Sequence, residues 1–233
     1  MATYCISDIH GDYDKYVKML DILNFGSEDL LYVIGDVLDR GSNSMAILKH
    51  MMKYPNIIPL IGNHEYMALQ CLNILSQEIT VESVDGMTDD ILQGLSEWVG
   101  VGGQPTIDDF QRLSKEEQQD ILDYLGEFEL YEEVECGDKM YVLVHAGLQN
   151  FNPERPLWDY GLSEMIFTTP DYSEVYYPDK YLVTGHLPTW TISENDSAER
   201  IYRKHNHIAI DCGCGYGGKL AAICLDTGEE YYV

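Results

Sequence analysis

Positive charge is scarce in this chain of 233 residues. Lysine and arginine together number 14, against 40 aspartate and glutamate residues, and the formal net charge is −26. A protein with this charge repels polyanions, so we expect neither nucleic acid nor an anionic membrane surface as a partner. An anionic substrate would therefore have to be held by bound metal ions or by a few arginines.

Cysteine pairs and long apolar runs are also missing. None of the six cysteines forms a CxxC pair, and the spacing does not favour a disulfide scaffold. No apolar run reaches the ~18 residues that a membrane-spanning helix needs. The first residues, MATYCISD, lead directly into a predicted strand without the pattern of a secretory signal. We therefore expect a cytoplasmic protein.

What is present indicates a layered α/β domain. Hydrophobic residues make up 45% of the chain, which is enough for a sizeable core. Short apolar runs alternate with amphipathic helical patterns in the first part of the chain. The predicted strands there are 3–6, 30–34 and 56–61, and the predicted helices are 12–25, 42–54 and 65–75. We expect residues 76–130 to form a helical segment over the sheet, strands to dominate from residue 139, and 1–233 to be one domain.

Residues that can bind metal ions follow the predicted strands. In chain order they are Asp8, His10, Asp36, Asn63, His145 and His186. Strand ends at one rim of a sheet bring distant residues together, and open α/β sheets bind ligands there. Carboxylate and imidazole groups together suit Mn, Fe or Zn. No cysteine is among these residues, which argues against a structural zinc site.

The stretch GDVLDRG, residues 35–41, favours two metal ions over one. A carboxylate can bridge ions held ~3.5–4 Å apart, and Asp36 is the natural bridge. Asp8 and His10 lie two residues apart on an extended segment, so they point the same way and would hold one ion. The three residues from the later strands would hold the other ion.

Five motifs in order resemble the phosphoprotein phosphatase family of calcineurin-like metallophosphoesterases: SDIHG, GDVLDRG, GNHE, HAGL and GH. The stretches WVGVGGQPT (98–106) and IDCGCGYGGKLAAICLDTGE (210–229) are similar to its bacterial and phage branch of Ser/Thr protein phosphatases. The resemblance implies two mixed sheets packed face to face and flanked by helices, with a dinuclear metal site at the strand ends. It also implies the ligand division given above, with Mn as the first choice of metal.

The same resemblance implies roles for three further residues. His64 would protonate the leaving oxygen, and Asp39 would orient its ring and raise its basicity. Arg40 would bind the phosphoryl oxygens through its planar fork. The nucleophile would be a hydroxide bridging the two ions. Trp98, with the glycines that follow it, would shape a loop near the metals.

One departure from the family concerns the second arginine that binds phosphate. The family carries it between HAGL and GH, and this chain has no arginine between Arg155 and Arg200. Arg155, in NPERPLWDY, is the nearest candidate, but it precedes the tryptophan, whereas the arginine of the family follows it. The alternative is a solvated surface arginine. A cluster of tyrosines at 172–181 either lines a substrate cleft or packs within its own loop.

Three functions remain open on the sequence. The first is a phosphomonoesterase of the Ser/Thr protein phosphatase type, acting on phosphorylated protein or a small phosphoester. The alternative is a symmetric diadenosine tetraphosphate hydrolase, whose metal motifs are similar. GNHE and the intact DRG favour the phosphatase. An inactive binding scaffold is the remote alternative, and the complete ligand set argues against it.

Overall fold

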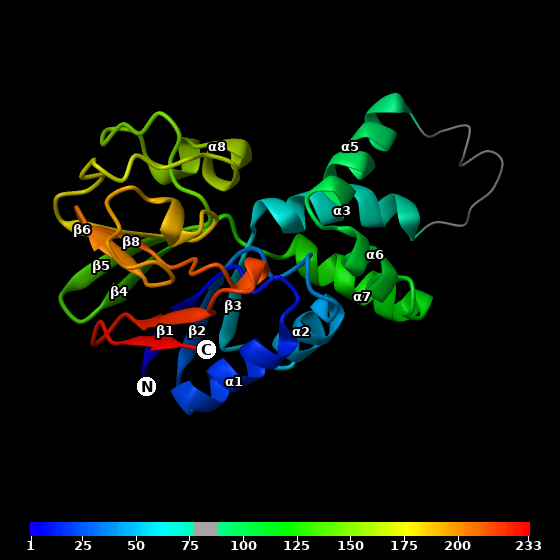
Figure 1. Cartoon of the computed structure of the whole chain (residues 1–233), viewed down its shortest axis with the longest axis horizontal. Helices are drawn as coiled ribbons and strands as arrows, with labels where there is room; N and C mark the ends of the chain where they lie inside the picture. The colour runs from blue at the N-terminus through cyan, green and yellow to red at the C-terminus, as the bar shows by residue number, and fades with distance from the viewer. Residues whose placement is uncertain (77–87) are drawn as a thin grey trace.

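The computed structural model describes residues 1–76 and 88–233, and strands account for its centre (Figure 1). The first sheet has the order β10-β9-β1-β2-β3. Its strands are β1 (Thr3–Ile6), β2 (Leu30–Ile34), β3 (Ile57–Leu60), β9 (Ala221–Cys224) and β10 (Glu230–Tyr232). The first three are parallel, whereas β9 runs antiparallel to both β1 and β10. The parallel strands therefore end at the same rim of the sheet.

The second sheet has the order β4-β5-β6-β8-β7. Its strands are β4 (Tyr131–Cys136), β5 (Lys139–Val144), β6 (Lys180–Thr184), β7 (Tyr202–Lys204) and β8 (His207–Ala209). Strands β5, β6 and β8 are parallel, and the two edge strands are antiparallel to their neighbours. Both sheets are therefore mixed, as the sequence predicts.

The two sheets share a hydrophobic core. Because side chains alternate between the faces of a strand, Ile34 of β2 points inward and Val33 points outward. Inward residues of the first sheet, such as Ile34 and Leu60, pack in one buried cluster with Leu143 and Val183 of the second. Val33 instead belongs to a larger cluster formed with the helices. This pattern confirms the predicted face-to-face packing of two sheets flanked by helices.

Helices α1 (Tyr13–Leu23) and α2 (Ser44–Met51) follow β1 and β2. Asp12 caps α1 as expected, because its side chain accepts a hydrogen bond from the backbone N of Lys15 at 3.0 Å. Helix α1 buries Tyr16 and Met19 in the helix-side cluster. The two helices lie together in Figure 1 beside the first sheet.

The predicted helical segment contains α5 (Asp89–Gly100), α6 (Gln104–Phe110) and α7 (Lys115–Gly126). With α3 (Asn63–Leu75) they lie together at the end of the molecule opposite the second sheet (Figure 1). A capping box begins α7, since Ser114 and Glu117 bond reciprocally through side chain and backbone. Residues 77–87 of the predicted segment lie outside the described residues.

Shorter elements complete the described chain. They are α8 (Leu162–Ile166) and the 3₁₀ turns η1 (Leu157–Asp159), η2 (Thr189–Thr191) and η3 (Cys214–Tyr216). Strands β4 and β7 were not predicted, although the burial of β4 alternates as expected for an edge strand. Among the described residues, no helix has both the length and the apolar character needed to cross a membrane.

Candidate active site

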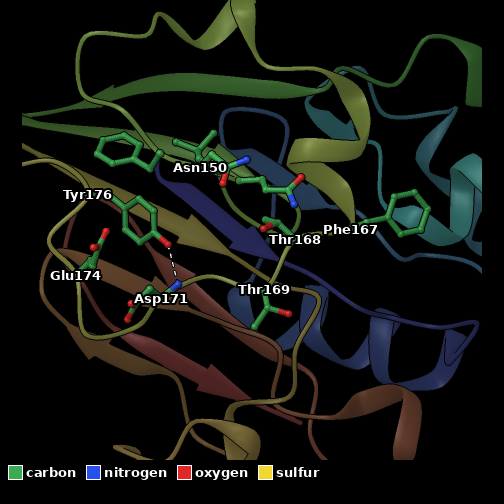
Figure 2. Close-up of a pocket in the computed structure, with 10 residues that line it drawn as sticks. Asn150, Phe167, Thr168, Thr169, Asp171, Glu174 and Tyr176 are labelled. Atoms are coloured by element: carbon green, nitrogen blue, oxygen red, sulfur yellow. Dashed lines mark hydrogen bonds between the residues drawn. The ribbon is translucent and has the colours of Figure 1, made fainter.

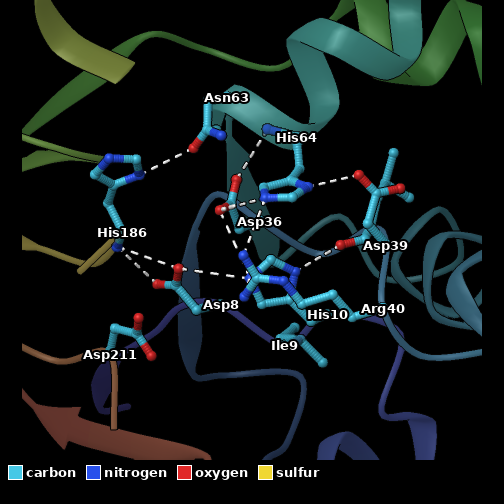
Figure 3. Close-up of polar contacts among 12 residues, drawn as sticks. Asp8, Ile9, His10, Asp36, Asp39, Arg40, Asn63, His64, His186 and Asp211 are labelled. Carbon is cyan, nitrogen blue, oxygen red and sulfur yellow. Dashed lines mark hydrogen bonds and ion pairs between the residues drawn. The ribbon is translucent and has the colours of Figure 1, made fainter. Parts of the chain in front are cut away.

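The predicted metal ligands meet at one rim, where strands of both sheets end. Figure 3 labels all of them except His145, whose Nε2 lies 3.0 Å from Oδ1 of Asn63. Their positions follow directly from the strand order. Asp8 and His10 follow β1, Asp36 follows β2, Asn63 begins α3 after β3, His145 follows β5, and His186 follows β6. Five separate strands therefore contribute side chains to one place, as the sequence pattern predicts.

The backbone at this rim is strained. Eleven described residues other than glycine have positive φ, and six of them are predicted site residues: Asp8, His10, Asp36, Asp39, Arg40 and His186. Such conformations cost about 1–3 kcal/mol each and concentrate at functional sites. Gly35 also has a positive φ, and a Cβ there would lie 2.5 Å from Nδ1 of His145. The turn before Asp36 therefore requires glycine both for its conformation and for its space.

The candidate ligands form two groups that share Asp36. His10, Asp36 and His64 offer ligand atoms within 4.8 Å of one another, and so do Asp36, His145 and His186. One oxygen of Asp36 lies 3.7 Å from Nε2 of His10, and the other lies 3.3 Å from Nε2 of His145. A carboxylate that faces both groups is placed to bridge two cations.

The other two predicted ligands, Asp8 and Asn63, lie beside these groups. Oδ1 of Asn63 lies 3.0 Å from Nε2 of His145 and 2.9 Å from Nδ1 of His186, in the second group. A carboxylate oxygen of Asp8 lies 3.9 Å from Nε2 of His10, in the first group. His64 also lies in the first group, although the family resemblance reserves it for proton transfer.

Two histidines are held in the tautomer that metal binding requires. Nδ1 of His10 donates to the carbonyl of Leu38 at 2.8 Å, and Nδ1 of His145 donates to the carbonyl of Ile34 at 2.9 Å. Each Nε2 therefore faces the site, where it can bind an ion once it carries no proton.

Buried negative charge also fits divalent cations. Asp8 and Asp36 are 1% and 2% exposed. Burial, together with the neighbouring charge of Asp36, raises the pKa of Asp8 to about 7. Cations bound between these groups would offset the cost of burying the carboxylates. The donor set thus fits two divalent ions such as Mn, Fe or Zn.

Beside the ligands lies the pair Asp39 and His64. Nδ1 of His64 donates to Oδ2 of Asp39 at 2.5 Å, and Nε2 of His64 lies 3.3 Å from the Arg40 guanidinium. Burial opposes protonation of His64, but Asp36 and Asp39 outweigh it and raise its pKa. Nε2 of His64 therefore lies next to Arg40, on the side of the ring away from Asp39.

Arg155 makes other contacts. Its guanidinium donates to both carboxylate oxygens of Glu164 at 2.8 Å and to the carbonyl of Asp159 at 2.6 Å. It also lies over the ring of Tyr160, 3.9 Å from the ring centroid. None of these partners is a predicted site residue. A role in phosphate binding would require the arginine to leave them.

Sequence reasoning missed the structural role of Glu65. The side chain is fully buried, and its two oxygens accept hydrogen bonds from the backbone N–H groups of Asp36, Val37, Leu38 and Gly62. Glu65 thus holds the loop that carries Asp36. Its place three residues after Gly62, at the start of α3, is the capping-box pattern that could have indicated this role.

A second missed residue is Asp211, which follows β8 and lies beside Asp8 in Figure 3. Burial and the charge of Asp8 raise its pKa well above the usual range. One of its oxygens accepts from the backbone N of Gly213 at 2.8 Å, which orders the loop that leads into η3. The sequence could have indicated Asp211, because IAID ends a predicted strand with an acid just as VIGD does at Asp36.

A cavity of about 530 Å³ lies next to the loop that carries His145 (Figure 2). Its lining includes Leu148 of that loop and Tyr176 of the tyrosine cluster. The hydroxyl of Tyr176 accepts from the backbone N of Asp171 at 2.8 Å. Tyr172, by contrast, stacks on His207, with ring centroids 4.9 Å apart. The tyrosine cluster therefore both packs within its loop and lines a cavity.

Three known proteins are similar to this chain over nearly its whole length. The chain is 28% identical to a bis(5'-nucleosyl)-tetraphosphatase PrpE (asymmetrical) of Halalkalibacterium halodurans, over 94% of this chain and 87% of that one. It is 25% identical to a symmetrical bis(5'-nucleosyl)-tetraphosphatase of Methylobacillus flagellatus, over 100% and 95%. It is 31% identical to serine/threonine-protein phosphatase 2 of Escherichia coli, over 94% and 90%.

The fold has solved counterparts as well. A cold-active protein tyrosine phosphatase matches with a TM-score of 0.58 at 16% identity, over 99% of this chain and 78% of that one. The family model of calcineurin-like phosphoesterases matches residues 1–211. With the two-sheet fold and the grouped ligands, this match shows that the chain is a hydrolase and belongs to the calcineurin-like phosphoesterase family.

Proposed function

We propose that the protein hydrolyses phosphomonoesters of the kind carried by phosphorylated serine and threonine. The observation that supports this most is the Asp39–His64 pair, whose imidazole lies beside both Arg40 and Asp36. An alkoxide is a poor leaving group, so a positioned proton donor contributes most to breaking a phosphomonoester, typically ~10²–10⁴-fold. A phosphate group leaving an anhydride is already stable as an anion and gains less.

Each residue then has a task. Asp8 and His10 would hold one ion, and Asn63, His145 and His186 the other, with Asp36 shared. Bound Mn²⁺ ions, the first choice, would neutralise phosphoryl charge and lower the pKa of water. Arg40 binds the phosphoryl oxygens.

Proton transfer completes the assignment. His64 donates its Nε2 proton to the leaving oxygen, and Asp39 balances the imidazolium charge from the other side of the ring.

The six cysteines are free and buried, which fits the reducing environment of the cytoplasm.

A second candidate is the hydrolysis of dinucleoside polyphosphates. The names of two of the relatives favour it. So does the surface next to Arg40, whose guanidinium lies 4.1 Å from the ring centroid of Tyr216. Tyr216 is 61% exposed and Trp190 beside it is 41% exposed, so a nucleobase could stack on either ring. Relatives of both kinds make this candidate comparable in support.

A substrate panel separates the two candidates. Phosphoserine and phosphothreonine peptides are compared with diadenosine tetraphosphate at equal concentration, all with Mn²⁺, by release of phosphate or nucleotide. The proposal expects a higher kcat/KM for the phosphopeptides. A clear preference for the dinucleotide would overturn it in favour of the second candidate.

A further inference from the structure

The carboxylate of Asp39 accepts hydrogen bonds from other side chains besides His64. Oδ2 also accepts from the indole Nε1 of Trp98 at 2.7 Å, and Oδ1 accepts from the hydroxyl of Thr106 at 2.6 Å. Asp39, Trp98 and Thr106 are all fully buried. Three side-chain donors therefore converge on one carboxylate that water does not reach.

Thr106 holds Asp39 at two points. While its hydroxyl donates to Oδ1, the same oxygen accepts from the backbone N of Asp39 at 2.9 Å. The side chain and the backbone of Asp39 are thereby fixed against the same residue. This matters because the backbone of Asp39 is in the left-handed region, with φ 74.

The segment 98–106, which joins α5 to α6, is built to make these contacts. A Cβ on Gly103 would lie 2.7 Å from the Trp98 ring, so the turn needs glycine there to admit the indole. The carbonyl of Gly102 accepts from the backbone N of Arg40 at 2.9 Å. One segment therefore supports both Asp39 and its neighbour Arg40.

We propose that Trp98 and Thr106 are positioning residues for the proton donor, acting on His64 through Asp39. The inference rests on the proposed role of His64. An indole N–H and a threonine hydroxyl fix the plane of the carboxylate and occupy two of its three remaining lone pairs. Oδ2 then stays turned to Nδ1 of His64, and Nε2 of His64 stays on the side of Arg40. With the carboxylate free to rotate, the imidazole would lose that alignment.

The test uses leaving groups of different quality. We measure kcat/KM with Mn²⁺ for p-nitrophenyl phosphate, whose leaving group is stable as an anion, and for phenyl phosphate, whose leaving group is less so. Loss of a proton donor slows the second substrate more than the first. His64→Asn provides the reference for that selective loss.

Trp98→Phe keeps an aromatic ring and removes the donor, and Thr106→Val keeps the shape and removes the hydroxyl. Each should lower kcat/KM for phenyl phosphate by about 10-fold or more, as expected for a lost hydrogen bond to a buried charge. Each should affect p-nitrophenyl phosphate much less. Thr106→Ser restores the hydroxyl and should recover most of the loss.

Tyr16→Phe is the matched control. It also removes a buried aromatic donor, because the Tyr16 hydroxyl bonds to His50 at 3.0 Å, and no predicted site residue takes part in that bond. It should leave the ratio of the two substrates unchanged. An equal loss for both substrates in Trp98→Phe and Thr106→Val would overturn the positioning role, and so would a loss of bound Mn²⁺ in these variants.

Failure of the proposed function gives a different result. If His64→Asn itself slows both substrates equally, His64 is not the proton donor. If Trp98→Phe does not fold, the Thr106→Val and Thr106→Ser pair still decides the inference.

Discussion

Glu65→Gln is a substitution of nearly equal size whose effect should be large. Each carboxylate oxygen of Glu65 accepts two backbone N–H groups, from Asp36 and Gly62 on one oxygen and from Val37 and Leu38 on the other. The amide of glutamine has one oxygen only. Two of the four N–H groups would then face an NH₂ group, buried and without an acceptor.

The cost can be estimated from these contacts. A buried donor left without a partner costs about 1–3 kcal/mol, so two of them cost about 2–6 kcal/mol. Domains have about 5–15 kcal/mol of unfolding free energy in total, so the variant should lose a large part of it. Affinity for Mn²⁺ should fall as well, because the N–H groups belong to the loop that carries Asp36.

Urea denaturation with EDTA measures the free energy of unfolding, and Glu117→Gln is the matched control. Glu117 occupies the same position of a capping box, at the start of α7, but is largely exposed. Its substitution should cost much less. A loss below about 1 kcal/mol for Glu65→Gln, or equal losses in the two variants, would refute the reasoning.

Three further predictions concern the site and its surroundings. Arg155→Ala should leave kcat/KM for p-nitrophenyl phosphate nearly unchanged, because the guanidinium is bound to Glu164; a drop of ~100-fold, worth about 2.7 kcal/mol, would show instead that it reaches the phosphate. Gly215→Ala should abolish most activity, because the added Cβ would lie 2.3 Å from the ring of His10 and 2.8 Å from Arg40. Full activity would show that the backbone around Gly215 can shift to make room for the methyl group. In the metal-free protein, burial and Asp36 raise the pKa of Asp8 to about 7, and Asp36 outweighs burial to raise that of His145 to about 10. Burial lowers the pKa of His10 and His186, which opposes this trend below about pH 6.5. Thermal stability in EDTA should therefore fall as the pH rises from about 7 to 9, whereas stabilisation by Mn²⁺ should grow; a flat profile in EDTA over that range would contradict these shifts.

The meeting of the candidate ligands at one rim could be predicted because each follows an apolar run that is typical of a strand. The rim then follows from the parallel order of those strands, so distant residues such as Asp8 and His186 were expected together. Strands β4 and β7 were harder to predict from the sequence. Tyr202–Lys204 is only three residues long, two of them charged, and it becomes a strand by pairing with β8.

Residues that act through other residues gave the weakest signals. Trp98 was expected near the metals, but its bond to Asp39 and that of Thr106 join residues 59 and 67 positions apart and appear only in the tertiary fold. Glu65 stood within a motif already assigned to metal binding, so its place three residues after Gly62 was not taken as a sign of its bonds to the backbone. Hydrogen-bond partners far apart in sequence leave no periodicity from which they could be predicted.

The division of labour between Asp36 and His64 is the centre of this account, and metal stoichiometry tests it most directly. Mn²⁺ bound per chain is measured by calorimetry for the wild type, Asp36→Asn and His64→Asn, with turnover of p-nitrophenyl phosphate in parallel. The wild type should bind two ions, and Asp36→Asn should bind both more weakly, because its carboxylate faces both ligand groups. His64→Asn should keep both ions and lose about 10²–10⁴-fold in turnover. Loss of an ion in His64→Asn would contradict the account, because His64 would then be a ligand and not the proton donor.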